Sequence, residues 1–148
     1  LRDSFYLDFL PDLAVDGVIA GPAGTGRVGA VAREDVARSA AAVLADLAAG
    51  ESRHDGAVYE LTGPRALSLS DVAAILTAAG HPTVYRQESV EEAYASRSVY
   101  GAPDWQVDAW VSTYTAIASG ALDRVTHDVE RLTGRRPLGL AELLAGRP

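Results

Sequence analysis

The sequence has 148 residues, of which 48% are hydrophobic, and it carries a formal net charge of −7. This length and composition fit a single domain over 1–148, and the acidic balance argues against nucleic acid and anionic membranes as partners. All 13 basic residues are arginine and there is no cysteine, which excludes disulfides, thiolate nucleophiles and lysine Schiff bases.

The sequence shows neither a membrane anchor nor an export signal. No apolar run reaches the roughly 18 residues of a membrane span, and no signal peptide is recognisable. We therefore expect a soluble, cytoplasmic protein. The chain contains no methionine and begins with Leu1, so we also expect it to continue upstream of this residue.

The N-terminal residues predict the end of a strand followed by a short helix. Leu1-Arg2 is typical of the last step of a strand, and Ser4 can cap a helix over Phe5–Leu10 that Pro11 ends. The spacing of Phe5, Phe9 and Leu13 places one face of this segment in the core. Further strand-like stretches are predicted over 18–20, 28–32, 57–61 and 83–87.

Local capping signals mark the later helices. Ser68 with Asp71, and Ser89 with Glu92, form capping boxes, and glycines follow several helix ends. Helices are predicted over 33–49, 69–79, 89–98, 104–119, 127–133 and 140–145. Val36, Ala40, Val43, Leu44 and Leu47 form the apolar stripe of the first of these helices.

These elements predict an α/β fold in which three short strands, over 28–32, 57–61 and 83–87, are each followed by a helix, with six to seven helices in all. Three short strands are too few for a doubly wound sheet of ordinary size. We therefore expect the remaining strands to lie upstream.

A glycine-rich turn joins the strand at Val18 to the segment that leads into the helix at Arg33. Gly21, Gly24 and Gly26 permit close backbone approach, so the turn can present N–H groups to a ligand. It is neither G-x-G-x-x-G nor a Walker loop, and a simple turn between strands remains the alternative.

An ordered series of short motifs runs through most of the chain. It comprises Leu1-Arg2-Asp3 with Tyr6, Gly17-Val18, Gly21-x-Ala23-Gly24-x-Gly26, Arg33-x-Asp35-x-Ala37, Val58-Tyr59-Glu60-Leu61-x-Gly63, and Leu69 with Ala73-Ala74-x-Leu76-Thr77. The series resembles the C-terminal half of NmrA-like atypical short-chain dehydrogenases, and it is most similar to the type 2 NAD(P)H:quinone oxidoreductases.

The resemblance implies the C-terminal, substrate-binding part of a Rossmann-like fold, without the N-terminal half that holds the dinucleotide. The implied cofactor is NADP or NAD, with Arg2, Gly21 and Gly24 on the cofactor side. The implied activity is reduction of quinones or similar enones by hydride transfer, and the alternative is a non-catalytic NAD(P)-sensing or partner-binding protein. The implied partners are the absent N-terminal half or a second copy of the chain, and a small-molecule substrate.

The resemblance also places several residues beside the substrate. Tyr6 is the candidate catalytic residue, because its hydroxyl can orient a quinone oxygen; the alternative is a partly buried helix tyrosine. The substrate-side candidates are Tyr6, Pro22, Ala23, Tyr94, Tyr100 and Trp105. The last three flank the break at 101–103, where they either form a lid over an aromatic substrate or anchor the packing of the break.

Other polar residues have simpler interpretations. Arg33 and Asp35 are expected to form an ion pair and cap at the helix start. His54, His81 and His127 lack a second ligand at metal-binding spacing, so no metal site is predicted. Trp110 and Tyr114 are assigned to the core by their helical spacing.

Overall fold

The computed structural model describes residues 1–146. It confirms the α/β class, but its strands are shorter and more numerous than the sequence predicts. The predicted domain 1–148 includes residues 147 and 148, which lie outside the described residues. The strands are β1 (Arg2–Asp3), β2 (Ala14–Val15), β3 (Val18–Gly21), β4 (Arg27–Val28), β5 (Glu60–Leu61), β6 (Leu67–Ser68) and β7 (Val84–Gln87).

The helices match the predicted ranges to within one or two residues. Capping explains this, because the predicted boxes are present: Ser68 accepts from the Asp71 N–H, and Ser89 accepts from the Glu92 N–H. The helices are α1 (Arg33–Ala48), α2 (Leu69–Ala78), α3 (Val90–Arg97), α4 (Asp104–Ala118), α5 (Asp128–Thr133) and α6 (Leu140–Ala145), with 3-10 turns η1 (Leu7–Phe9), η2 (Pro11–Leu13) and η3 (Ser98–Tyr100).

The strands form three small sheets. β1 pairs with β5 in parallel, and β4 pairs with β6 antiparallel. The third sheet has the order β2-β3-β7, in which β2 and β3 are antiparallel and β3 and β7 are parallel. Its register places Val18 opposite Val84 and Ala20 opposite Arg86.

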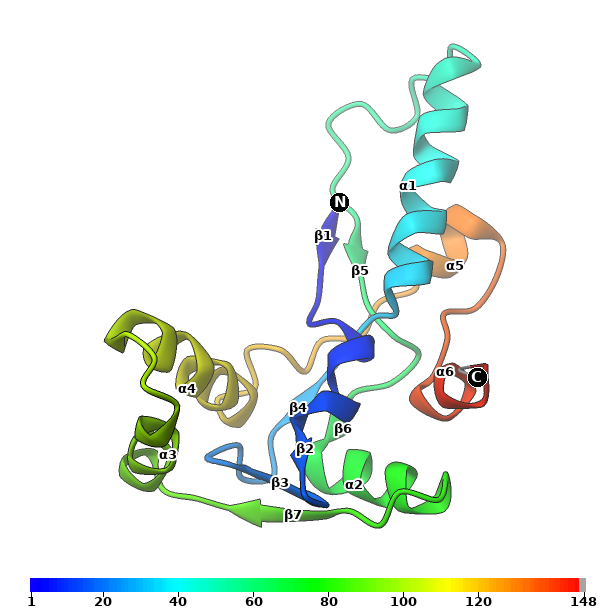
Figure 1. Cartoon of the computed structure of the whole chain (residues 1–148). Helices are drawn as coiled ribbons and strands as arrows, with labels where there is room; N and C mark the ends of the chain where they lie inside the picture. The colour runs from blue at the N-terminus through cyan, green and yellow to red at the C-terminus, as the bar shows by residue number, and fades with distance from the viewer. Residues whose placement is uncertain (147–148) are drawn as a thin grey trace.

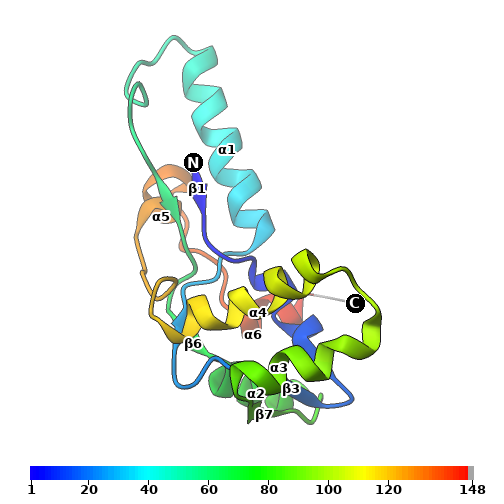
Figure 2. The same cartoon turned by 90° about the vertical axis from the view of Figure 1, so that its left-hand side faces the viewer.

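The elements form a body from which an arm extends (Figure 1). The arm consists of α1, β1 and β5, and it points upward in both Figure 1 and Figure 2. The sheet β2-β3-β7 and α2 lie at the base of the body, and α3 and α4 lie together on one side of it (Figure 1). The arm is joined to the body by the segments that enter α1 and leave β1 and β5.

The predicted helix over Phe5–Leu10 is absent. Tyr6 is extended, with φ −78° and ψ 124°, because it forms a parallel bridge with Val31. Only the 3-10 turns η1 and η2 follow. Leu7 and Leu10 are buried. Of the expected face, Phe5 and Leu13 are partly buried and pack against the main core, whereas Phe9 is 44% exposed.

The predicted strand over 28–32 is also interrupted. After β4 the chain passes beneath the loop before α5, where the Gly29 N–H donates to the Leu122 carbonyl at 2.8 Å. A Cβ at Gly29 would lie 2.3 Å from the Arg124 carbonyl oxygen. The close crossing therefore replaces a continuous strand by β4 and the bridge at Val31.

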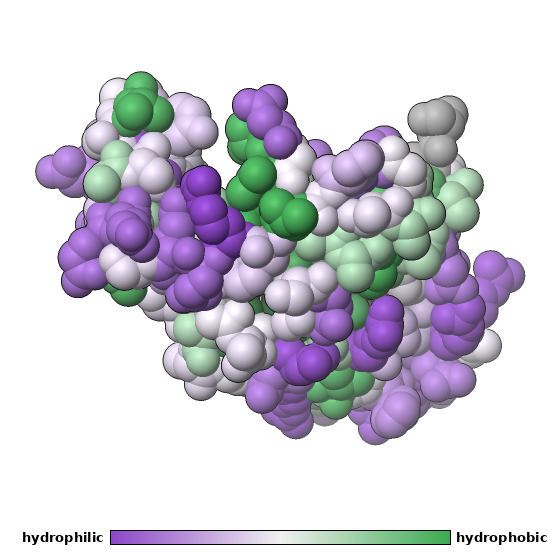
Figure 3. Space-filling view, turned by 90° about the horizontal axis from the view of Figure 1, so that it is seen from below, coloured by the Kyte–Doolittle hydropathy of each residue, from purple (hydrophilic) through white to green (hydrophobic). Residues whose placement is uncertain are grey.

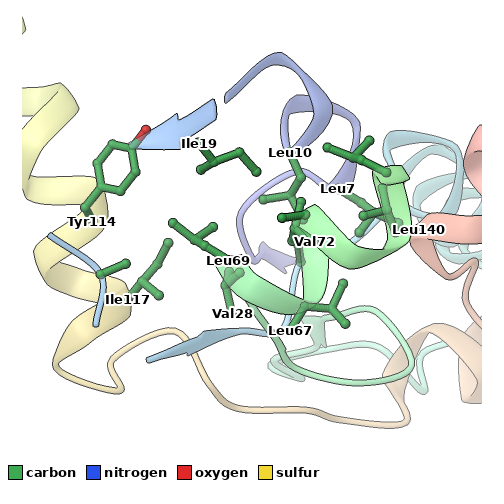
Figure 4. Close-up of a cluster of buried hydrophobic side chains, with 14 of the residues drawn as sticks. Leu7, Leu10, Ile19, Val28, Leu67, Leu69, Val72, Tyr114, Ile117 and Leu140 are labelled. Carbon is green, nitrogen blue, oxygen red and sulfur yellow. The ribbon is translucent and has the colours of Figure 1, made fainter. Parts of the chain in front are cut away.

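The main core lies between the sheet β2-β3-β7, α2, α4 and α6. Figure 4 shows its side chains meeting from these elements and from η1, β4 and β6, with Tyr114 and Ile117 reaching in from α4. The labelled members are Leu7, Leu10, Ile19, Val28, Leu67, Leu69, Val72, Tyr114, Ile117 and Leu140.

The apolar stripe predicted for α1 is only partly covered. Val36 packs against the small cluster of Val31, Leu61 and Val129. Further along the helix, Leu44 is 65% exposed and Leu47 is 45% exposed. The stripe is uncovered there because the C-terminal part of α1 extends beyond the body.

Candidate functional site

The site is a pocket between the sheet β2-β3-β7 and the pair of helices α3 and α4. Its volume is about 690 Å³. In the space-filling view from below, a notch separates the side of the molecule where Figure 1 places α3 and α4 from its middle (Figure 3). The lining residues are Phe5, Asp12, Leu13, Val15, Val18, Ala20, Arg86, Glu88, Ser96, Arg97, Tyr100, Trp110, Thr113 and Tyr114.

One face of the sheet forms the floor of the pocket. Side chains alternate between the two faces of a strand, so Val18 and Ala20 of β3 share a face while Ile19 points to the core. Arg86 is the partner of Ala20 on β7, and Val15 is the partner of Val18 on β2. Because side chains alternate along each strand, β2, β3 and β7 all contribute side chains to the floor of the pocket.

Aromatic side chains form the opposite wall. Trp110 and Tyr114 lie one helical turn apart on α4, and Tyr100 comes from η3. The rings of Tyr100 and Trp110 meet edge to face, with centroids 6.0 Å apart. Tyr114 belongs to the main core, as its helical spacing predicts, and Trp110 packs against the small cluster of Ala93, Val107 and Val111. Both residues also line the pocket, which the sequence does not predict. Thr113, a polar residue on the same helical face, was the available signal that this face is not wholly core.

An enclosed ion pair lies at the end of the floor. Nη1 of Arg97 lies 3.1 Å from Oε2 of Glu88 and also donates to the Ala93 carbonyl at 3.0 Å. Nη2 of Arg97 donates to the Ala20 carbonyl at 3.0 Å, and the guanidinium lies 5.0 Å from the Tyr114 ring centroid. Sequence reasoning missed this pair because its members come from different elements.

Of the predicted substrate-side aromatic residues, Tyr100 lines the pocket. Tyr94 and Trp105 lie outside the lining. The Tyr94 hydroxyl donates to Asp108 at 2.9 Å and so links α3 to α4. This bond to a carboxylate raises the pKa of Tyr94. Trp105 is 71% exposed at the start of α4.

Tyr6 lies on the other side of the chain from the pocket, although its neighbour Phe5 lines it. Its hydroxyl donates to Asp3 at 3.3 Å, and its ring packs against the cluster of Val31, Leu61 and Val129. Arg2, the predicted cofactor-side residue, is exposed and lies 3.7 Å from Glu60. The structure therefore brings Tyr6 and Arg2 to the arm and not to the pocket.

Backbone N–H groups of the glycine-rich turn form hydrogen bonds within the protein. The Ala23 N–H donates to the Tyr85 hydroxyl at 3.1 Å, and the Gly24 N–H donates to Gln87 at 2.7 Å. These N–H groups are not bare, contrary to the expectation for a ligand-binding turn. Burial raises the pKa of Tyr85, so its phenol stays protonated and also donates to the Gly21 carbonyl at 2.8 Å.

Close packing explains two of the turn's glycines. A Cβ at Gly21 would lie 2.3 Å from the Tyr114 ring, and one at Gly26 would lie 2.1 Å from the Ile117 carbonyl oxygen. Pro22 and Ala23 are buried beside them. The turn thus allows α4 to approach the sheet, and α4 in turn supplies the aromatic wall.

The expected ion pair between Arg33 and Asp35 is wrong. Asp35 is fully buried, pairs with Arg38, and accepts a 2.7 Å hydrogen bond from the Leu138 N–H. The Arg33 N–H instead donates to Asp8 at 2.9 Å. Asp35 thereby connects α1 to the segment before α6, because its buried carboxylate needs partners.

The residues described do not form a dinucleotide pyrophosphate site. Such a site uses free N–H groups at a helix N-terminus beside a glycine turn. Asp8 accepts from the first N–H of α1, and capping boxes occupy the starts of α2 and α3. α4 has Asp104 in its first turn, whose carboxylate repels a phosphate.

Within residues 1–146, no cluster of three or more metal-ligating side chains is present. None of the helices described is both long and apolar enough to cross a membrane.

Comparison with known proteins places the chain in a family. No family model matches it. It is 32% identical over 138 residues to quinone oxidoreductase 2 of Escherichia coli, which covers 93% of the chain and 46% of that protein. The solved structure of the NADPH-dependent quinone oxidoreductase of E. coli with NADPH has a TM-score of 0.82 and 28% identity, over 97% of this chain and 51% of that one. The chain corresponds to the C-terminal half of the NmrA-like family.

A further NmrA-like relative reduces a different class of acceptor. The NAD(P)H azoreductase of Xenophilus azovorans is 35% identical over 122 residues, 82% of this chain and 41% of that protein. The chain thus spans about half the length of the relatives it matches, and it fits the C-terminal half of the NmrA-like fold.

Proposed function

We propose that this chain is the substrate-binding lobe of an NAD(P)H-dependent oxidoreductase that reduces quinones or similar enones by hydride transfer. The nucleotide would be held mainly by an N-terminal half, because the residues described offer no pyrophosphate site. The role of this lobe is to bind the acceptor, orient it and shield it from water.

The pocket is the observation that carries this proposal. Its volume of about 690 Å³ falls within the range of roughly 300–1,000 Å³ that is usual for small-molecule sites. An apolar floor of Val18 and Ala20 faces a wall that contains Tyr100 and Trp110. A planar conjugated ring fits between such surfaces, since aromatic rings gain from stacked or edge-to-face contact.

The names of the relatives support the same reaction class. Two of them reduce quinones or azo compounds with NAD(P)H, and both acceptor types are planar and conjugated. The second candidate is a non-catalytic protein of the same fold that senses NAD(P) or binds a partner. The pocket favours the enzyme, because a partner-binding protein does not need a small-molecule pocket with an aromatic wall.

Binding can be tested on the chain itself through its two tryptophans. The Trp105→Phe variant retains only Trp110, which lines the pocket. We expect 1,4-naphthoquinone to quench its emission along a saturable curve. The matched Trp110→Phe variant retains the exposed Trp105, and we expect only linear collisional quenching. Linear quenching in both variants would refute an acceptor site in this pocket.

Turnover separates the enzyme from the sensor. The N-terminal half of E. coli quinone oxidoreductase 2 can be joined in front of Leu1 to supply the nucleotide site. We expect this chimera to oxidise NADPH only when naphthoquinone is present. A chimera that binds both NADPH and the quinone but shows no turnover would favour the sensor.

We also propose that another polypeptide segment covers the arm. β1 has one neighbouring strand among the residues described, so its other edge is open for pairing. The arm and the residues that flank its strands carry exposed apolar side chains: Leu1 before β1, Leu44 and Leu47 on α1, and Val58 before β5. The N-terminal half or a second copy of the chain is the expected partner, and light scattering of the isolated chain should report association in its absence.

Tyr6 remains the proposed catalytic residue, and Arg2, Gly21 and Gly24 remain proposed cofactor-side residues. Arg2 lies on β1 of the arm, and Tyr6 follows β1 where the arm joins the body. Contact of either residue with a cofactor therefore depends on the polypeptide segment that covers the arm. Pro22, Ala23, Tyr94 and Trp105 remain proposed substrate-side residues, although only Tyr100 of the predicted set lines the pocket.

A further inference from the structure

The pocket contains an uneven set of charges. Arg86, Glu88 and Arg97 lie together at its β7 side, and Asp12 lies beside β2. Asp12 comes just before β2, and β3 separates β2 from β7, so the acidic and basic groups lie toward opposite edges of the sheet. The apolar floor therefore has a local net charge of +1 at one end.

Two of these charges cancel within the protein. Arg97 and Glu88 are joined at 3.1 Å, and their side chains are 11% and 7% exposed. The donors of Arg97 are occupied by Glu88, Ser96 and the carbonyls of Ala20 and Ala93. This pair stiffens the end of the pocket and offers a ligand no net charge.

Arg86 is the cation that remains. Its side chain is 65% exposed, and its contact with Oε1 of Glu88 is 3.4 Å long, which makes it a weak hydrogen bond. A guanidinium has five N–H donors, so most of them are available at the pocket. The backbone of Arg86 is held by the pairing of β7 with the central strand β3, where Arg86 lies opposite Ala20.

We propose that Arg86 makes this pocket selective for planar conjugated acceptors that carry an anionic substituent, a sulfonate or a carboxylate. The inference rests on the proposed function, since it assigns an orientation to the acceptor within the same pocket. The ring lies on the floor of Val18 and Ala20 with its anionic group toward Arg86. The planar fork of arginine matches the oxygens of such groups.

The overall charge of the chain makes this selectivity distinctive. With a net charge of −7, the protein as a whole repels anions. A preference for an anionic acceptor must therefore come from a local contact. Without Arg86, the anionic acceptor should bind more weakly than its neutral parent.

The experiment compares 1,4-naphthoquinone with 1,4-naphthoquinone-2-sulfonate. Both are titrated against the Trp105→Phe chain and followed by Trp110 emission. The absence of cysteine and lysine from the chain removes the side chains that quinones most readily modify. We expect the sulfonate to bind about fivefold more tightly than the neutral quinone, as for a partly exposed ion pair, and we expect the preference to fall as salt is added.

Arg86→Gln and Arg135→Gln in the same background make a matched pair. Each removes one positive charge, and Arg135 is exposed and outside the pocket. We expect Arg86→Gln to abolish the preference for the sulfonate, and circular dichroism with urea denaturation checks that the variant is folded. We expect Arg135→Gln to keep the preference.

The outcomes separate this inference from the proposed function. If the parent binds the neutral quinone but shows no preference for the sulfonate, the role of Arg86 is refuted and the acceptor site stands. Equal loss of preference in both variants would also refute it, because it would show a general field rather than a contact. If neither quinone binds, the acceptor site itself is refuted.

Discussion

Nη1 of Arg97 lies 3.1 Å from Oε2 of Glu88, and the two residues come from the end of α3 and the residue after β7. The pair fixes the helix against the sheet at the end of the pocket. Because both side chains are nearly enclosed, removal of one leaves a buried charge without its partner. The geometry of the site and the stability of the fold are therefore linked here.

We expect Glu88→Ala to lower the free energy of unfolding by about 3 kcal/mol, the lower end of the cost of breaking a buried pair. The remaining bonds of Arg97 to carbonyl groups keep the loss from being larger. Urea denaturation monitored by circular dichroism measures it. Arg86→Gln is the control, with an expected loss of less than about 1 kcal/mol. A loss below about 1 kcal/mol for Glu88→Ala would show that the pair does not stabilise the fold.

A second prediction concerns the approach of α4 to the glycine turn. At Gly26 an added Cβ would meet the Ile117 carbonyl oxygen at 2.1 Å, whereas at Gly24 it would meet nothing within 4 Å. We expect Gly26→Ala to cost at least about 2 kcal/mol through backbone displacement. Gly24→Ala should cost about 1 kcal/mol, because its φ is +56°.

The same pair of variants tests the architecture of the pocket. Displacement of α4 moves Trp110, so naphthoquinone should bind more weakly to Gly26→Ala than to Gly24→Ala. Unfolding curves provide the stabilities, and the quenching titration provides the affinities. Equal unfolding free energies and equal naphthoquinone affinities of the two variants would contradict the packing role of Gly26.

A third prediction is the pH dependence of the α2 cap. Hydrogen bonds from the backbone N–H and hydroxyl of Ser68 lower the pKa of Asp71 below its ordinary value. The folded state therefore favours the carboxylate, and this stabilisation is present above the unfolded pKa of about 3.9 and is lost as pH falls through the lower folded pKa.

Asp71→Ala should accordingly cost about 1 kcal/mol at pH 7, the usual contribution of a cap. The difference in unfolding free energy from the parent should shrink as pH falls below about 4. Ser70→Ala is the control, since Ser70 is exposed on the same turn. The difference in unfolding free energy between this variant and the parent should not depend on pH. A difference that stays constant down to pH 2 would contradict the role of the carboxylate.

A fourth prediction is that the isolated chain does not bind NADPH at micromolar concentrations. The starts of α1, α2 and α3 are occupied by Asp8 and two capping boxes, and α4 has Asp104 in its first turn, so none of these four helix starts offers a pyrophosphate site. Isothermal titration calorimetry measures this, with naphthoquinone as the positive control for a folded chain. Micromolar affinity for NADPH would overturn this account of the helix starts.

The last prediction separates catalysis from packing at Tyr6. Its hydroxyl makes an exposed 3.3 Å hydrogen bond to Asp3, so Tyr6→Phe should change stability by less than about 0.5 kcal/mol. If the hydroxyl orients the acceptor, kcat/KM of the chimera should fall about tenfold, the equivalent of roughly 1.4 kcal/mol. An unchanged rate across several quinones would leave Tyr6 as a packing residue.

Most of the pocket could not have been read from the sequence. Arg86 lies within a predicted strand, Glu88 directly follows it, Arg97 lies at the end of a predicted helix, and the helical spacing of Trp110 assigns it to the core. What brings them together is the pairing of β7 with β3 and the contact of α3 with α4, which join residues far apart in the chain. A helical stripe identifies a face that is not in water, but it does not distinguish a core from a pocket wall.

The sequence by itself determined the helices, the α/β class and the likeness to the NmrA-like family, because capping boxes, glycine stops and motif spacing act over a few neighbouring residues. Tertiary structure alone decided the strand lengths, the enclosure of the turn's N–H groups and the partner of Asp35. Strand pairing and burial depend on residues that are distant in sequence: Tyr6 is extended because Val31 lies beside it, and Asp35 is satisfied because Leu138 reaches it from 103 residues away.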